Sequence, residues 1–189
     1  MNFRHKLKRF WNFLKKDTWQ SWLVSIILII LFIKLIFFPV LSLITGTSLP
    51  LVVIESCSMY HESSFEEWWM KNSAWYESKE IGKADFESFP FKNGLNKGDI
   101  IFVTGKKEYE LGEVIIFDAA AKHPLIHRII EKSPISTKGD HNADQLDIEK
   151  NISESSIIGK STLRIPLLGW IKLIFFDFSR PESQRGLCR

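Results

Sequence analysis

Residues 22–44 read WLVSIILIILFIKLIFFPVLSLI, an almost unbroken apolar run near the start of the chain. At about 1.5 Å per residue, a helix of this length crosses the roughly 30 Å hydrocarbon core of a bilayer. The run is too long for the apolar region of a cleavable signal peptide, and no A-x-A site follows it. A helix that is apolar on every face is also hard to bury in a small domain. The sequence therefore predicts a transmembrane anchor over residues 19–44.

The residues that precede this run predict its orientation. Residues 1–16 carry six basic side chains and no acid, and such segments stay on the cytoplasmic side. We expect residues 1–18 to form a cytoplasmic, basic amphipathic segment on the lipid surface, with residues 45–189 outside. Nucleic-acid binding is the rival interpretation of a basic arm. Beside a membrane span the lipid bilayer is the favoured partner, and no nucleic-acid partner is expected.

Two residues interrupt the apolar run. If the span covers residues 19–38, Lys34 lies about a turn from its outer end and can extend its ammonium group toward the interface. Pro39 has no backbone N–H, so it is expected to end or kink the helix.

The chain as a whole has the composition of a folded protein. Hydrophobic residues make up 45% and charged residues 25% of the 189 residues, which excludes a disordered tail. The two cysteines, Cys57 and Cys188, are too few for a disulfide-rich or Cys-rich zinc fold. Short runs of strand composition are separated by glycine turns, which predicts a mainly β domain. These runs are residues 51–55, 99–104, 113–117, 125–130 and 157–165.

Residues 60–96 differ and predict a small helical insertion. Ser64 and Glu67 have the spacing of a capping box, and aromatic residues then recur at helical spacing. We expect a helix at about 65–79 and a second short one at about 84–89. The insertion is interpreted as packing on the sheet, with a lid or a membrane-facing surface as the alternative. Residues 169–178 are also apolar, and two interpretations of them stay open. They form an element of the core, or they form a surface that inserts into the outer leaflet.

Three segments hold side chains that suit hydrolytic chemistry. Ser56 and Ser58 follow an apolar strand, His127 lies within another, and Asp140 follows a lysine and a glycine. A serine hydroxyl needs a neighbouring base to become a good nucleophile, and histidine titrates in the right range for that task. A carboxylate can fix the tautomer of that histidine. Each piece alone is a weak signal.

Together, in this order and after an N-terminal span, the segments resemble type I signal peptidase. The matching segments are ESCSM at 55–59, KGDII at 97–101, GEVIIF at 112–117, PLIHRI at 124–129, TKGDHN at 137–142 and RIPLLGW at 164–170. Bacterial members of this family carry a lysine base, whereas archaeal and endoplasmic-reticulum members carry histidine followed by arginine. His127 and Arg128 place the resemblance with the second branch. It covers residues of about 20–172, apart from the insertion.

The resemblance implies a fold, an activity and residue roles. It implies a mainly β catalytic domain that removes signal peptides from preproteins at the outer membrane face, without a cofactor. Ser58 is then the nucleophile and His127 the general base, with Asp140 or Asp147 in support and Asp144 as a rival to Asp147. The oxyanion is expected at the Ser58 N–H with help from the Ser56 hydroxyl. No substrate-binding residue is assigned.

The family also implies the setting of the enzyme. The location is the cell membrane, or the endoplasmic-reticulum membrane in a eukaryote, and accessory membrane subunits are candidate partners. A catalytically inactive, membrane-anchored binding subunit of a processing complex is the alternative function.

The chain departs from the family pattern near the nucleophile. Cys57 replaces a glycine, which makes it a rival nucleophile, and His61 is a second candidate base where the family has other residues. His141 replaces an asparagine. No metal is expected, because the spacing of the candidate ligands matches no zinc signature. Those candidates are His123, His127, His141, Asp140 and Asp144.

Overall fold

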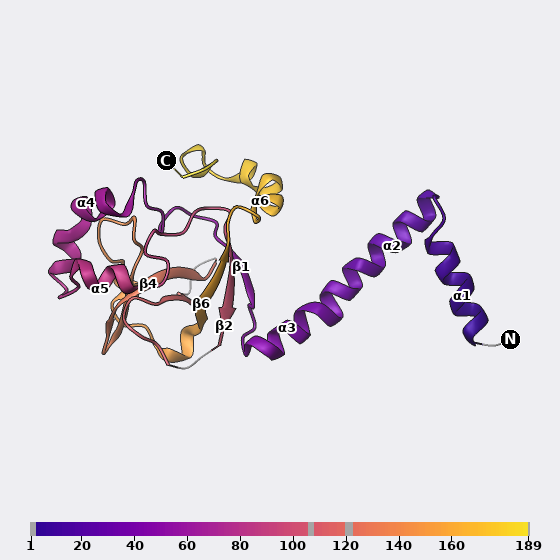
Figure 1. Ribbon diagram of the computed structural model, residues 1–189, viewed down its shortest axis with the longest axis horizontal. Helices are drawn as coiled ribbons and strands as arrows, with labels where there is room; N and C mark the ends of the chain where they lie inside the picture. Colours follow the sequence, from indigo (N-terminus) through magenta and orange to yellow (C-terminus); the bar gives the residue numbers. More distant parts are fainter. Residues whose placement is uncertain (1–2, 106–107, 120–122, 189) are drawn as a thin grey trace. The chain divides into compact units, whose positions relative to one another are not determined.

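The computed structural model describes residues 3–105, 108–119 and 123–188 (Figure 1). The chain divides into two compact units, Met1–Ile44 and Thr45–Arg189, and each is described by itself.

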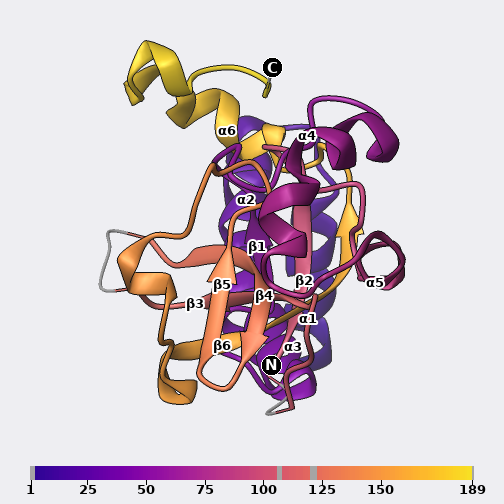
Figure 2. The same ribbon diagram turned by 90° about the vertical axis from the view of Figure 1, so that its left-hand side faces the viewer.

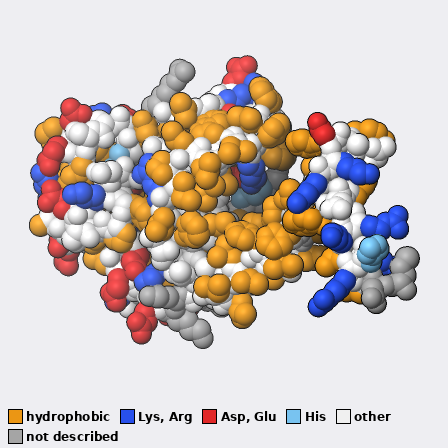
Figure 3. Space-filling model, turned by 45° about the vertical axis from the view of Figure 1, so that its right-hand side comes forward, with side chains coloured by type: hydrophobic (Ala, Val, Ile, Leu, Met, Phe, Trp, Pro, Cys, Tyr) orange, Lys and Arg blue, Asp and Glu red, His pale blue; other side chains and the backbone are white. Residues whose placement is uncertain are grey.

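The first unit is helical. Helix α1 (Phe3–Leu14) carries four of the six basic residues, and Lys15 and Lys16 directly follow it; basic side chains gather at the right of Figure 3. Helix α2 (Trp19–Phe32) begins at Thr18, whose side chain accepts a hydrogen bond from the Ser21 N–H. Capping of this kind satisfies a backbone donor that the first helical turn leaves without a partner.

One apolar helix continues through the predicted break. A π-helical segment, Ile33–Phe37, joins α2 to α3 (Phe38–Thr45). The π-turn lies immediately before Pro39, where a regular helical hydrogen bond is lost, so the helix changes its local winding and continues. The combined helix, Trp19–Thr45, has 27 residues and is long and apolar enough to cross a membrane by length and composition. Lys34 lies within the π-helical segment.

The second unit is built on a six-stranded antiparallel sheet (Figure 2). The strands are β1 (Leu51–Val53), β2 (Ile100–Thr104), β3 (Val114–Phe117), β4 (Leu125–Lys132), β5 (Ile135–Lys138) and β6 (Ile157–Ile165). Their order in the sheet is β1-β2-β6-β3-β4-β5. The prediction of a mainly β domain is confirmed, and each of the five predicted runs contains a strand. β5 was not predicted, because its sequence ISTK has one apolar residue and lacks the usual strand pattern.

Among the described residues, buried apolar side chains form three clusters. One gathers side chains of β2 and β3 with Ile54, Met59 and Leu95, another joins the insertion to β4, and the third gathers side chains of β3 and β4 with Ile152. The first comprises Ile54, Met59, Leu95, Ile101, Val103, Val114 and Ile116. Met59 is 1% exposed, so the residue directly after Ser58 anchors the nucleophile segment in the core.

The insertion forms two helices, as predicted. They are α4 (Phe65–Glu77) and α5 (Lys83–Ser88), and the Ser64 hydroxyl accepts the Glu67 N–H at the start of α4. Trp68, Trp69 and Tyr76 are buried in one cluster with Phe86 and with Ile130 of β4. The insertion therefore packs on the sheet through its aromatic side chains.

The end of the chain is a series of short helical turns. Residues 170–176 form α6 (Trp170–Phe176), in which Leu173 is buried while Ile171 and Phe175 are exposed. A 3-10 turn, η4 (Asp177–Ser179), and another, η5 (Glu182–Gln184), follow it. Two more 3-10 turns, η2 (Asp147–Glu149) and η3 (Glu154–Ser156), lie between β5 and β6.

Candidate active site

The nucleophile segment leaves β1 and is held at both ends. The Ile54 N–H donates to the Asp99 carbonyl at 2.8 Å, and the Ile54 carbonyl accepts the Gly98 N–H at 2.8 Å. Beyond the turn, the Met59 carbonyl accepts the Leu95 N–H at 2.7 Å. Between these points the Ser58 hydroxyl lies 3.2 Å from the hydroxyl of Ser56. The two hydroxyls expected to act at the site are therefore neighbours.

His127 lies on β4 opposite Ile115 of β3, and its side chain is buried. Its Nδ1 contacts a carboxylate oxygen of Glu149. The same Glu149 oxygen accepts the Thr137 hydroxyl at 3.0 Å, and the other accepts the Leu146 N–H at 2.9 Å. Burial raises the pKa of Glu149, but the hydrogen bonds, led by that from His127, leave it below its ordinary value. An ionised Glu149 selects the tautomer with the proton on Nδ1, which leaves Nε2 as an acceptor.

Gly139 is the point where the serine and histidine segments meet. A Cβ added at Gly139 would lie 2.8 Å from the Ser58 carbonyl oxygen and 2.9 Å from His127 Nε2. The His141 N–H donates to the same Ser58 carbonyl at 2.8 Å. Within the described residues the hydrogen bond of the Ser58 hydroxyl goes to Ser56, and none joins it to His127. Hydrogen bonds of a catalytic pair are often long before substrate binds.

Asp140 is the centre of a separate buried network. Its carboxylate accepts two hydrogen bonds from Arg128, at 2.9 and 2.7 Å, and one from Tyr76 at 3.3 Å. It also lies 3.0 Å from Nε2 of His61. Burial raises the pKa of Asp140, but Arg128 and His61 together hold it well below its ordinary range. The structure therefore pairs Asp140 with Arg128 rather than with His127.

The carboxylate on His127 differs from the expected aspartates. Asp147 is exposed and pairs with Lys150 at 2.7 Å, and Asp144 accepts the Trp75 indole N–H at 3.0 Å. Glu149, two residues after Asp147, makes the contact instead because η2 turns its side chain back toward β5. Sequence reasoning missed Glu149. The one feature of the local sequence that bears on Glu149 is its position three residues after Leu146, because its side chain accepts the Leu146 N–H at the start of η2.

The two rival residues of the nucleophile segment are both engaged elsewhere. Cys57 forms a disulfide with Cys188, with their Cα atoms 5.6 Å apart, so it carries no free thiol. His61 stacks on Trp68, with ring centroids 3.8 Å apart, and its Nε2 faces Asp140. In the part of the chain that the structure describes, no three potential ligands are placed to hold a metal ion.

The insertion supports the loop that carries Gly139. Lys138 is buried, and its ammonium lies over the rings of Trp75 and Tyr76 at 4.8 and 5.1 Å. Burial lowers the pKa of Lys138 to about 8. The aromatic side chains of α4 thus contact three residues in and beside this loop. Trp75 and Tyr76 lie under the Lys138 ammonium, Tyr76 donates to Asp140, and Trp75 donates to Asp144.

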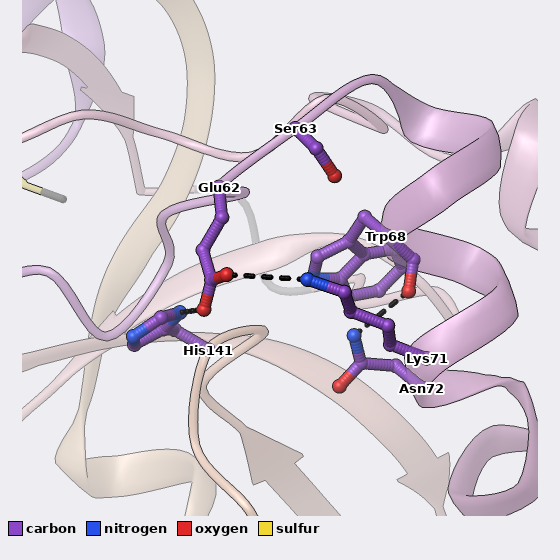
Figure 4. A pocket seen from close by; sticks show the side chains of 6 residues that line it. All are labelled: Glu62, Ser63, Trp68, Lys71, Asn72 and His141. Carbon is purple, nitrogen blue, oxygen red and sulfur yellow. Dashed lines mark hydrogen bonds and ion pairs between the residues drawn. The ribbon is translucent and has the colours of Figure 1, made fainter.

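A polar pocket lies between α4 and this loop (Figure 4). Its volume is about 220 Å³, and its lining is Glu62, Ser63, Trp68, Lys71, Asn72 and His141. The Glu62 carboxylate faces the Lys71 ammonium at 3.4 Å and the His141 ring at 3.9 Å. Since the His141 N–H binds the Ser58 carbonyl, the pocket adjoins the nucleophile segment.

The site combines a serine with a histidine–carboxylate pair on an antiparallel β domain, and these are the residue types that serine hydrolases use. The comparisons with known proteins are more specific. The signal peptidase complex catalytic subunit SEC11 of Verticillium alfalfae is 26% identical over an alignment of 98 residues, which covers 44% of this chain and 57% of the relative. The corresponding subunit of Fusarium vanettenii is 24% identical over 98 residues, with the same shares.

These relatives confirm the resemblance to type I signal peptidase of the endoplasmic-reticulum branch. The chain spans a little over half the length of the curated relatives that it matches. No protein-family model matches it.

Proposed function

We propose that this chain is a membrane-anchored serine endopeptidase that removes signal peptides from preproteins. The observation that carries the proposal is the approach of the Ser58 segment and His127 Nε2 to the same point at Gly139, with Glu149 on the other ring nitrogen. The similarity to catalytic subunits of signal peptidase complexes supports the substrate class. Accessory subunits are proposed partners on the same ground.

In the proposed reaction His127 Nε2 accepts a proton twice, first from the Ser58 hydroxyl and later from a water molecule. Nε2 accepts the proton of the Ser58 hydroxyl as Oγ attacks the scissile carbonyl, and Glu149 stabilises the resulting imidazolium. The Ser58 N–H and the Ser56 hydroxyl donate to the oxyanion. Collapse of the intermediate transfers the proton to the leaving amine and leaves the signal peptide esterified to Ser58. A water molecule, deprotonated by Nε2, then hydrolyses that ester.

The proposed setting is a membrane with the catalytic domain on its outer side. The helix Trp19–Thr45 supports a single span, and the basic helix α1 before it supports a cytoplasmic N-terminus. An enzyme tethered at the bilayer meets signal helices at a raised effective concentration. The cell membrane and the endoplasmic-reticulum membrane are the two candidate locations.

The test is preprotein cleavage by the full chain in liposomes. We expect Ser58→Ala and His127→Ala to abolish cleavage, whereas Cys57→Ala, which loses only the disulfide to Cys188, should still cleave at a reduced rate. If folded Ser58→Ala cleaves preprotein at the wild-type rate, the nucleophile assignment fails. If the folded wild type cleaves no preprotein, the catalytically inactive binding subunit becomes the better interpretation.

Replacing Gly139 with alanine is expected to lower kcat by about 100-fold. The added methyl group would lie within 3.0 Å of the Ser58 carbonyl and His127 Nε2, so the two segments must move apart, and small misplacements of reacting groups cost about this much. The measurement is cleavage rate at saturating preprotein. Gly82→Ala is the matched control, since its methyl group would meet only the Asp85 side chain at 3.3 Å. Equal kcat in the two variants would contradict the prediction.

A further inference from the structure

The C-terminal residues 177–188, here called the C-terminal segment, are attached to the nucleophile segment at two points. Arg180 donates to the Glu55 carbonyl at 2.8 Å and also pairs with the Glu55 carboxylate. Cys188 forms the disulfide with Cys57. The attached residues are close to Ser58: Glu55 lies three residues before it, and Cys57 lies one residue before it.

The C-terminal segment is itself fixed to the sheet. The buried Lys97 donates to the Asp177 carboxylate at 2.6 Å and to the Gln184 carbonyl at 2.7 Å. Asp177 also accepts the Gly186 N–H at 2.8 Å, which folds the segment back on itself. Lys97 directly precedes Gly98, whose N–H binds the Ile54 carbonyl. The segment therefore rests on the same turn that holds the start of the nucleophile segment.

In the part of the chain that the structure describes, few other contacts hold residues 55–58. Within them, the Cys57 carbonyl accepts the Tyr60 N–H at 3.0 Å, and the Ser58 carbonyl accepts the His141 N–H. The Glu55 side chain has a second cation, Lys172 at 3.0 Å, which belongs to α6. A bidentate guanidinium contact fixes direction as well as distance, and a disulfide restricts the conformations open to the chain that it joins. Both act on residues whose position sets that of the Ser58 hydroxyl.

We propose that the C-terminal segment is a brace that positions Ser58, with Arg180 and the Cys57–Cys188 disulfide as its two attachment points. This inference rests on the proposed function. Arg180 acts through Glu55 and is a positioning residue. Reduction of the disulfide by an added dithiol transfers two electrons and two protons, which yields two thiols and oxidises the dithiol to its own disulfide. The reduced enzyme loses one attachment point and is less active.

The first experiment compares kinetic constants of the full chain in liposomes. We expect Arg180→Ala to lower kcat by about 10- to 100-fold with little change in KM, because the nucleophile is displaced while substrate contacts remain. Arg180→Lys should recover part of the loss. Lys132→Ala, which removes an exposed ion pair with Glu110, is the control and should match the wild type. A wild-type kcat in Arg180→Ala would overturn the brace.

The second experiment tests the disulfide. Dithiothreitol is expected to lower the kcat of the wild type by about 10-fold. The double variant Cys57→Ser/Cys188→Ser should have a low kcat from the start, and dithiothreitol should not change it. Equal activity of the wild type and the double variant, with and without dithiothreitol, would contradict the proposal.

Hydrogen exchange separates failure of the brace from failure of the proposed function. Loss of the brace should speed exchange of the Tyr60 amide, which is bonded to the Cys57 carbonyl, while the Ile116 amide in β3 keeps its protection. Faster Tyr60 exchange in Arg180→Ala supports the brace even if no preprotein is cleaved. Unchanged Tyr60 exchange in both Arg180→Ala and the double cysteine variant would overturn it, whatever the cleavage assay shows.

Discussion

Glu149→Gln is expected to lower the kcat of preprotein cleavage by roughly 10⁴-fold while the protein stays folded. The carboxylate contacts His127 Nδ1, and in the proposed mechanism it accepts the Nδ1 proton in the resting state and stabilises the imidazolium that forms as Ser58 attacks. A glutamine has the same shape, but its amide nitrogen can present a donor to Nδ1. The ring then takes the other tautomer, with the proton on Nε2, and cannot accept the proton of Ser58.

The matched control for this prediction is Asp147→Asn. It makes the same chemical change two residues away, on an exposed side chain that forms an ion pair with Lys150. We expect wild-type kcat for Asp147→Asn, with cleavage measured at saturating preprotein and folding checked by circular dichroism. If Asp147→Asn is inactive and Glu149→Gln is active, the carboxylate assignment from the structure is reversed.

The parts of the fold that follow from local sequence were predictable. Apolar composition alone identifies the helix Trp19–Thr45, and the aromatic spacing after Ser64 identifies α4. β5 escaped prediction because its buried residues are Ser136, Thr137 and Lys138. These polar side chains are buried because each has a partner in another element: Gln145, Glu149 and the rings of α4.

The site was predictable only as far as the serine and the histidine. The motif order predicts Ser58 and His127, the nucleophile and base of the proposal, but the carboxylate that contacts His127 depends on how η2 is oriented against β5, which no spacing in the sequence encodes. The disulfide depends in the same way on the path of the last residues of the chain. Contacts between distant segments are tertiary properties, and residue patterns constrain them weakly.

Arg128→Met is expected to lower the free energy of unfolding by about 3–5 kcal/mol at pH 7. Arg128 is fully buried, and beyond its two bonds to Asp140 it donates to the carbonyls of Pro90, Phe91 and Gly112. Methionine fills similar volume but leaves a buried carboxylate without its guanidinium and removes a donor from three carbonyls, of which that of Phe91 keeps the Gly94 N–H at 2.8 Å. Lys132→Met, which breaks an exposed ion pair, is the control and should change stability little. Urea unfolding of the detergent-solubilised chain measures the difference.

The pH dependence of this loss identifies the Asp140 charge as its cause. The folded-state pKa of Asp140 is lowered, so its ion pair stabilises the wild type above the unfolded-state pKa of about 3.9 and loses that contribution as pH falls below it. In Arg128→Met, burial acts on the carboxylate without the opposing guanidinium, so its pKa rises and protonation relieves the unpaired charge. The stability difference between the two proteins should therefore shrink as pH is lowered from 7 toward 3. A difference that stays constant over this range would mean that lost packing and carbonyl contacts, rather than the Arg128–Asp140 charge pair, account for the destabilisation.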